Sequence, residues 1–222
     1  MPGLYESRNL KQPISNQAVE FETDHIFPIF NRGNNSQCLF FTRDNYLFFI
    51  EKIRTHVLPH ADILAWCLMP THFHLMVHVN DLHMERIERI EQVTRSHLLN
   101  RTRSFNDSIA ILLRSYTRAI QKQESRTGSL FQNRTKAICL TCNDGISPAW
   151  FQCKYGAMIH VDHPEKAYPQ VCFDYIHANP VKDMLVNEME EWEFSSARDY
   201  AGLRNETLVN KKRAQEFGLV YR

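Results

Sequence analysis

The sequence predicts an α+β protein in which helices cover an antiparallel sheet. Three observations indicate this class. Residues 61–69 (ADILAWCLM) and 72–79 (HFHLMVHV) are apolar runs separated by Pro70-Thr71, a pattern typical of two strands joined by a turn. Residues 42–59 and 106–124 carry apolar side chains at helical spacing. The chain has 222 residues and is 43% hydrophobic, which is sufficient for a packed core.

The first two elements are predicted from local signals. Residues 24–35 (DHIFPIFNRGNN) resemble a strand that enters a Gly/Asn turn, and Pro28 within it favours an edge strand or a bulge. Thr42 or Asp44 can cap the helix that follows, and Pro59 ends it. The apolar runs described above then supply the second and third strands.

The second half of the chain predicts a further helix and strand. Asn106 or Asp107 can cap the helix over 106–124, and a Gly turn leads from it to a fourth strand near 134–140. The order strand, helix, strand, strand, helix, strand predicts a ferredoxin-like (RRM-like) antiparallel sheet with helices on one face. The other face would then be open to a ligand.

Additional C-terminal helices are plausible near 147–160 and 167–179, and Pro180 would end the second of them. The expected organisation is a polar N-terminal arm over 1–22, a main domain over 23–185 and a C-terminal tail over 186–222. The charged segment 81–104 is either a helix or a loop insertion.

Neither a signal-peptide pattern nor an apolar window of membrane-spanning length occurs in the sequence. We therefore expect a cytoplasmic protein with no membrane partner. The six cysteines do not resemble a disulfide framework, so we expect reduced, mostly small apolar residues. Cys139 and Cys142 form a C-x-x-C pair, but no second pair stands at a spacing suited to zinc.

Two histidines lie one residue apart in the third predicted strand. Because side chains alternate between the faces of a strand, His72, His74, Met76 and His78 share one face. The apolar residues at the odd positions, 73–79, share the other. Positions i and i+2 lie about 6–7 Å apart, so the imidazoles of His72 and His74 can reach one metal ion. The alternative is a hydrogen-bonded histidine pair without a metal.

Five segments, in this order, carry a resemblance to a known family: NRGNN (31–35), MPTHFHLMV (69–77), RTGSLFQNRTKA (126–137), YIHANPVK (175–182) and EWEFSSARDYAG (191–202). Together they resemble the HUH single-tyrosine transposases, particularly the REP-associated tyrosine transposase-like group, over about residues 24–203. Residues 23–185 would then form the catalytic domain.

The resemblance implies that His72, His74 and an amide hold a divalent metal, Mg²⁺ or Mn²⁺. It also implies that a tyrosine attacks single-stranded DNA and forms a transient 5′-phosphotyrosine, with Tyr175 at the family position. Asn179 follows four residues later, on the same helix face, and is the expected amide ligand. A phenol with a pKa near 10 is a poor nucleophile at neutral pH, so a nearby cation would assist it.

Some assignments differ from the family or stay open. Some family members carry glutamine where this chain has Asn179, and Pro180 can distort the last helical turn. Tyr116 is the second candidate nucleophile, although packing or DNA contact suits its mid-helix position better. His78 and His177 are expected either to support the site, to face DNA or to be incidental surface residues.

A basic region lies between Arg95 and Lys136. It holds nine cationic and two acidic residues, a local formal charge of +7 in a chain whose total is +1. Such a concentration favours phosphate contacts, and a solvated helix face is the alternative. The expected DNA-binding residues are Arg114, Arg118, Lys122, Arg126, Arg134 and Lys136. Phe105 and Phe131 could stack on bases, although core packing suits both.

The expected function is metal-dependent cleavage and rejoining of single-stranded DNA that contains hairpins, which is DNA transposition by a tyrosine nucleophile. A homodimer is expected because family members commonly pair through their sheets. Two other functions compete with this one. The first is a domesticated relative that binds hairpin DNA or RNA without cutting it. The second is a different metalloenzyme in which His72 and His74 support hydrolysis by an activated water.

Overall fold

The computed structural model describes residues 20–85, 102–141, 150–152, 158–160, 164–205 and 208–222. The N-terminal arm up to residue 19 and residues 86–101 of the charged segment lie outside the described residues. The elements, in chain order, are β1 (Ile26–Arg32), η1 (Asn34–Ser36), α1 (Arg43–His56), β2 (Ala61–Met69), β3 (His72–Val79), β4 (His83–Glu85), β5 (Thr102–Ser104), α2 (Phe105–Gln123), β6 (Lys136–Ala137), β7 (Trp150–Gln152), β8 (Met158–His160), α3 (Pro164–Lys182), η2 (Met189–Glu191), α4 (Ala197–Tyr200) and α5 (Lys211–Glu216).

A four-stranded antiparallel sheet, in the order β2-β3-β1-β6, lies at the centre of the molecule. The α+β class is therefore confirmed, and β2 and β3 have the predicted bounds. The fourth strand has two residues, where the sequence predicted 134–140. β1 is an internal strand by strand order. However, β6 pairs only with Ile29 and Phe30 of β1, so Pro28 interrupts no hydrogen bond between β1 and β6.

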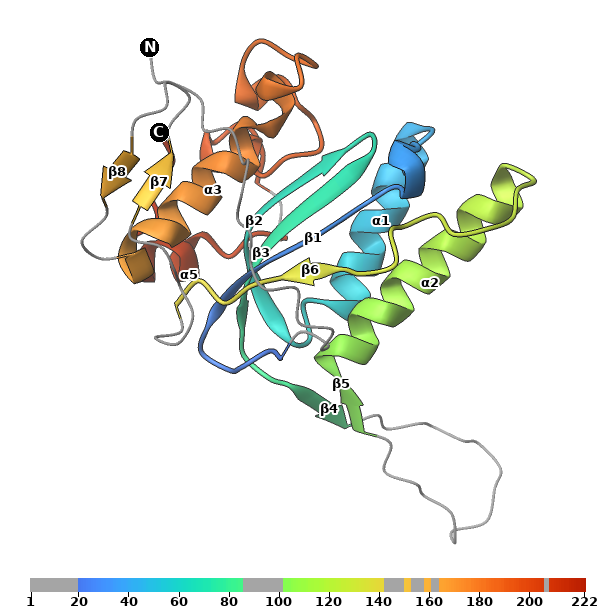
Figure 1. Cartoon of the computed structure of the whole chain (residues 1–222), viewed down its shortest axis with the longest axis horizontal. Helices are drawn as coiled ribbons and strands as arrows, with labels where there is room; N and C mark the ends of the chain where they lie inside the picture. The colour runs from blue at the N-terminus through green and yellow to red at the C-terminus, as the bar shows by residue number, and fades with distance from the viewer. Residues whose placement is uncertain (1–19, 86–101, 142–149, 153–157, 161–163, 206–207) are drawn as a thin grey trace, which may run out of the picture.

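The two faces of the sheet are both covered. Phe27, Phe73 and Leu75 point into a core shared with α1 and α2, whereas Ile26 and Met76 point into a second core shared with α3. Figure 1 shows α1 and α2 on one side of the sheet and α3 with α5 on the other. The expectation of an open face is therefore wrong, because this face is itself apolar and α3 buries it.

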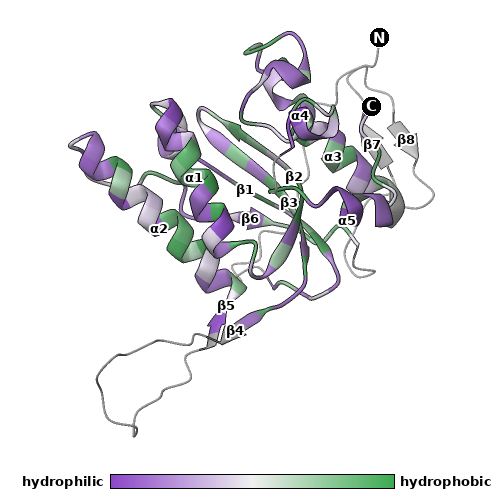
Figure 2. Ribbon diagram, turned by 180° about the vertical axis from the view of Figure 1, so that it is seen from behind, coloured by the Kyte–Doolittle hydropathy of each residue, from purple (hydrophilic) through white to green (hydrophobic). Residues whose placement is uncertain are grey.

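Helices α1 and α2 are amphipathic, and Figure 2 shows hydrophobic and hydrophilic residues side by side along both. Thr42 caps α1 as predicted, and the Asn45 Oδ1 atom accepts from the Thr42 backbone N–H at 3.1 Å. The N-cap of α2 is Ser104 rather than Asn106 or Asp107. Its hydroxyl accepts from the Asp107 N–H at 3.1 Å, and the Asp107 carboxylate accepts from the Ser104 N–H at 3.3 Å. Asp107 is thus the third residue of a capping box.

Two predictions about the C-terminal helices are corrected. Residues 150–152 and 158–160, expected in a helix, form the antiparallel pair β7 and β8. Helix α3 does not end before Pro180 but continues to Lys182. A proline removes one helical hydrogen bond. Because Pro180 is buried, tertiary packing holds this turn helical, and backbone bonds from Asp183 to Asn179 and from Leu185 to Pro180 close the helix end.

Residues 186–222, expected as a tail, pack along the outer edge of β2. Ser195 pairs with Cys67, and Val209 pairs with Ile63, through isolated β-bridges of the backbone. The Trp192 indole N–H donates to the Leu68 carbonyl at 3.0 Å.

Among the described cysteines, Cys38, Cys67 and Cys172 are free thiols, whereas Cys139 is disulfide-bonded, which corrects the expectation of reduced cysteines throughout. None of the described helices is both long and apolar enough to cross a membrane.

Replacing Arg204 with alanine is expected to destabilise this C-terminal packing strongly. Arg204 binds the fully buried Asp199 carboxylate at 2.6 Å and donates to the Glu193 and Ser195 carbonyls. Removing it takes the guanidinium away from a buried carboxylate, so the free energy of unfolding should fall by about 3–5 kcal/mol in urea titrations. Arg198→Ala, which removes a single bond to the Glu190 carbonyl, is the control. Equal losses in both variants would contradict this assignment.

Candidate metal and nucleophile site under helix α3

The predicted histidine pair lies on β3, on the face that α3 covers. The ring centroids of His72 and His74 are 5.1 Å apart, with the ring planes at 89°. His74 lies opposite Phe30 of β1 in the sheet register, and their rings stack at 5.6 Å. The Thr71 hydroxyl lies 3.1 Å from His72 Nδ1. Strand alternation therefore places the two imidazoles together, as the sequence predicted.

Helix α3 brings the other two predicted site residues to these histidines. The Tyr175 ring meets the His74 ring edge-on, with centroids 5.5 Å apart and planes at 86°. Asn179, one turn later, donates from its amide nitrogen to the Tyr175 carbonyl at 2.9 Å, and its side chain also hydrogen-bonds the His72 ring. Two segments about a hundred residues apart in the chain thus converge, and all four predicted residues lie in one cluster.

Burial keeps both imidazoles neutral. Loss of solvent lowers the pKa of His74 to about 3, with smaller contributions from His72 and Lys182. Burial also lowers the pKa of His72, which Arg32 lowers further, while Asp183 and the hydrogen bond to Asn179 oppose the shift. A neutral imidazole has a free lone pair, which is the form that binds a metal ion.

The residues present fit a divalent metal centre with open positions. The described part of the chain holds no group of three or more His, Cys, Asp and Glu side chains arranged for a metal, so a metal here would rely on two imidazoles and the Asn179 amide. With the Asn179 nitrogen engaged by the Tyr175 carbonyl, the ligand atom would be its oxygen, which faces the His72 ring. Because the protein would supply only a small number of ligands, coordination positions stay open for a substrate oxygen, as catalytic metal sites require.

His78 and His177, the two other histidines considered for the site, are buried in the packing around it instead. His78 is buried, with its Nδ1 atom 2.8 Å from the Asn80 side-chain oxygen. His177 is buried on another face of α3, where its Nε2 atom lies 2.7 Å from the Ser196 hydroxyl. Neither is a surface or DNA-facing residue.

The second candidate nucleophile, Tyr116, lies in the core. It is fully buried, and its hydroxyl donates to the Leu39 carbonyl at 2.7 Å. Burial raises the pKa of Tyr116 well above the usual range for a phenol. Phe105 and Phe131 are also buried core residues. These positions favour packing roles for all three.

The six predicted DNA-binding cations do not form one patch. Arg114 and Arg118 are exposed on α2, and Lys122 is exposed in its last turn. Arg126 hydrogen-bonds the Gln37 side chain and lies over the Phe41 ring. Arg134 is exposed. Lys136 lies on the histidine side of the sheet, with its Nζ atom 5.4 Å from the centroid of the Phe30 ring.

Several residues around the cluster were not predicted. Lys182 places its Nζ atom 4.2 Å from the centroid of the Tyr175 ring, and it follows Tyr175 by seven residues, so the helical period could have indicated it. Asp183 and Arg32 lie close enough to His72 to shift its pKa. Arg32 and Phe30 depend on the pairing register of β1 with β3, which the sequence pattern does not specify.

Acid is expected to destabilise the fold through its buried histidines. Burial lowers the pKa of both His74 and His177 to about 3, so the unfolded chain takes up protons that the folded one does not. The stability is therefore present above pH ~6.5 and is lost as the pH falls toward 3. Between about pH 7.5 and about pH 5 the free energy of unfolding should fall by about 4 kcal/mol.

Urea titrations at the two pH values test this expectation. His177→Gln removes one of these two groups and should lessen the fall by about 2 kcal/mol. A stability independent of pH over this range would contradict the buried, neutral state of these histidines.

Neither a protein-family model nor a curated protein matches the chain. Among solved structures, that of a REP-associated tyrosine transposase bound to a REP hairpin is similar, with a TM-score of 0.51 and 16% sequence identity. The similarity covers 89% of this chain and 90% of that chain. At this identity it shows a shared fold, which extends over nearly the whole of both chains.

Proposed function

We propose that this protein is a metal-dependent, single-strand DNA endonuclease and strand transferase, that is, a transposase with a tyrosine nucleophile. One observation carries the proposal: Tyr175 and Asn179 of α3 lie directly against the neutral His72–His74 pair of β3. The shared fold with a hairpin-bound tyrosine transposase supports it. The strand order β2-β3-β1-β6 supports the ferredoxin-like assignment of the core.

In this proposal His72, His74 and Asn179 hold Mg²⁺ or Mn²⁺. The ion would neutralise charge on the scissile phosphate and favour the phenolate. The Tyr175 oxygen attacks phosphorus, forming a Tyr–O–P bond as the bond from phosphorus to the 3′ oxygen breaks. The phenolic proton leaves, and the departing oxygen takes up a proton to give a free 3′ hydroxyl. The 5′ phosphate stays joined to Tyr175, so the step is reversible and strands can be rejoined.

Charged residues around Tyr175 suit a phosphodiester substrate. Lys182 lies over the Tyr175 ring, and Arg32 and Lys136 lie on neighbouring strands of the same face. Arg32 and Lys136 are exposed and Lys182 is half-buried, and cations that can reach phosphates provide the electrostatic part of nucleic-acid affinity. We propose hairpin-containing single-stranded DNA as the partner and the cytoplasm as the location. We also propose a homodimer. Ser195 and Val209 occupy the β2 edge, so the dimer contact would use another surface.

The test is covalent trapping. The protein is incubated with labelled hairpin oligonucleotides drawn from the DNA that flanks its gene, with Mn²⁺ or with EDTA, and then denatured. We expect a protein–DNA band that resists denaturation and requires the metal. Absence of the band with every oligonucleotide would overturn the proposal.

A second candidate is supported by the position of α3. The helix covers the histidines, and His74 is 9% exposed, so a ligand must enter at the edge of this cover. A domesticated protein that binds hairpins without cleaving them is consistent with such a covered site. Retained hairpin binding without any covalent band would favour this candidate over the enzyme.

A further inference from the structure

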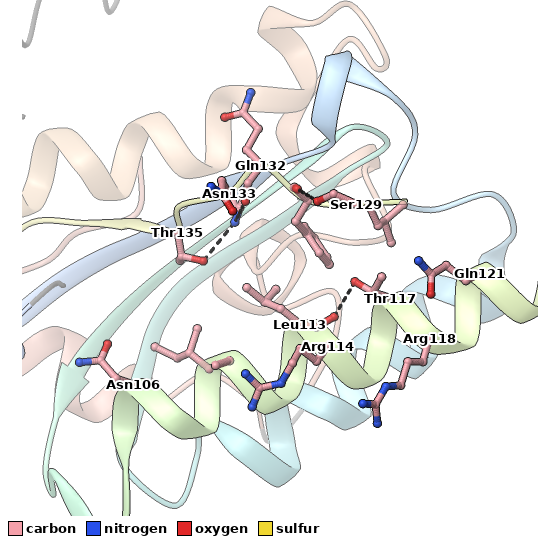
Figure 3. A pocket seen from close by; sticks show the side chains of 15 residues that line it. Asn106, Leu113, Arg114, Thr117, Arg118, Gln121, Ser129, Gln132, Asn133 and Thr135 are labelled. Atoms are coloured by element: carbon pink, nitrogen blue, oxygen red, sulfur yellow. Dashed lines mark hydrogen bonds between the residues drawn. The ribbon is translucent and has the colours of Figure 1, made fainter. Parts of the chain in front are cut away.

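A groove of about 490 Å³ lies between α2 and the segment 129–135, on the opposite face of the sheet from the histidines. Figure 3 shows Arg114, Thr117 and Arg118 on the helix, with Asn133 and Thr135 on the facing segment. Ala110, Leu113, Leu130 and Phe131 are apolar members of the lining. No acidic residue is among the described residues that line it. The groove therefore has a mixed lining, in which apolar side chains lie beside polar ones and Arg114 and Arg118 add positive charge.

The facing wall is held in place by Asn31 of β1. Its amide nitrogen donates to the Gln132 carbonyl at 3.2 Å and to the Thr135 hydroxyl at 3.1 Å. The exposed Asn133 side chain makes no hydrogen bond with any residue in the described ranges. Asn133 thus offers a free donor and acceptor beside apolar members of the lining, a combination that can recognise a planar polar ring.

The groove is joined to the histidine cluster through the edge of the sheet. Thr135 lines the groove, and the next residue, Lys136, pairs with Phe30, whose ring stacks on His74. β6 is the outermost strand of this sheet and has two residues. A flexible polyanion that crosses this short edge would pass from the groove to the face of the sheet that carries His74.

We propose that this groove binds an unpaired base of the DNA strand whose phosphate lies at Tyr175, so that the groove recognises bases while the histidine site acts on the backbone. The choice of DNA as ligand rests on the proposed function. The volume, the apolar members of the lining and Asn133 suit a base, and exposed Arg114 and Arg118 suit the adjoining phosphates. The two arginines and the absence of acidic residues among the described lining residues favour this ligand over a neutral or cationic one.

The test compares two probes of equal charge: a thymidylate oligomer of about twelve nucleotides and an abasic oligomer of the same length. The full-length protein should bind the thymidylate oligomer at least about tenfold more tightly, because base stacking adds to affinity. Ala110→Phe fills the groove and should reduce this preference to less than about threefold. Leu47→Phe adds the same ring on the exposed face of α1, where Leu47 is 39% exposed, and should preserve it.

The phosphate contribution is separated by salt. Arg114→Ala and Arg118→Ala should weaken the binding of both probes and lower the salt dependence, with the base preference unchanged. Circular dichroism confirms that each variant is folded before its affinity is measured.

Three outcomes overturn the inference: equal affinity of the native protein for both probes, an unchanged base preference in Ala110→Phe, or tighter binding of a uridylate RNA oligomer than of thymidylate. These failures are distinct from failure of the proposed function. A covalent band with no role for the groove would leave the nuclease proposal intact. Loss of base preference in Ala110→Phe, without any covalent band, would support base binding in the groove and contradict the proposed cleavage activity.

Discussion

Replacing Tyr175 with phenylalanine is expected to abolish covalent attachment to DNA, with a loss of about three orders of magnitude or more. The phenyl ring keeps the edge-on contact with His74 and the position of Lys182 over the ring, so the fold and DNA affinity should change little. Only the attacking oxygen is lost. The measurement is the yield of protein–DNA band that survives denaturation, together with the affinity for the same hairpin.

Tyr168→Phe is the matched control, because it removes a phenolic oxygen from the same helix seven residues earlier. It should leave the covalent yield unchanged. A covalent band that persists in Tyr175→Phe would mean that another residue is the nucleophile. Cleavage without any covalent band, unchanged by Tyr175→Phe, would favour hydrolysis by an activated water instead.

Loss of either histidine is expected to reduce Mn²⁺ affinity by about 100-fold or more, since each supplies one of few protein ligands. His72→Ala tests the half-buried ring. His74→Gln tests the buried ring while preserving most of its volume, because alanine there would leave a cavity beside Phe30. Calorimetric titration with Mn²⁺ measures the effect, and the covalent yield should fall in parallel.

His83→Ala is the control for these variants, because His83 is an exposed histidine on β4. It should bind Mn²⁺ as the native protein does. Native-like Mn²⁺ affinity in both His72→Ala and His74→Gln would show that the cluster is not a metal centre, and the histidine pair would then be structural.

Sequence patterns predicted the sheet well because its strands carry strong local signals. β2 and β3 are two long apolar runs on either side of a turn, and their bounds agree with the prediction. The α2 cap was misplaced because Ser104, Asn106 and Asp107 are all good cap residues, and the capping box that selects Ser104 depends on the start of the helix. The helix prediction was wrong over 150–152 and 158–160 because short strands have weak patterns, and tertiary pairing overrides local propensity.

The candidate site was predictable in its parts. Alternation along β3 placed His72 beside His74, and helical period placed Tyr175 beside Asn179. The contact between these two pairs is tertiary: it arises because the apolar face of β2 and β3 is covered by Phe173 and Ile176 of α3. The cover itself was not predicted: a helix over 167–179 was expected, but its sequence does not indicate which face of the sheet it packs against.

The groove beside α2 also depends on tertiary structure. Arg114 and Arg118 were predicted to contact DNA, but the facing wall comes from a segment without regular secondary structure, held by Asn31. Amphipathic periodicity indicates which face of α2 is exposed, and it does not indicate what lies across from that face.

Mass spectrometry of the trapped complex tests the central claim most directly. The native protein is incubated with a hairpin oligonucleotide and Mn²⁺, digested with protease and nuclease, and searched for a peptide that carries a nucleotide. The proposal predicts a 5′-linked nucleotide on Tyr175, formed with Mn²⁺ and missing with EDTA. A nucleotide on any other residue, or one that forms equally in EDTA, would contradict the assignment of Tyr175, His72, His74 and Asn179 to one metal-dependent centre.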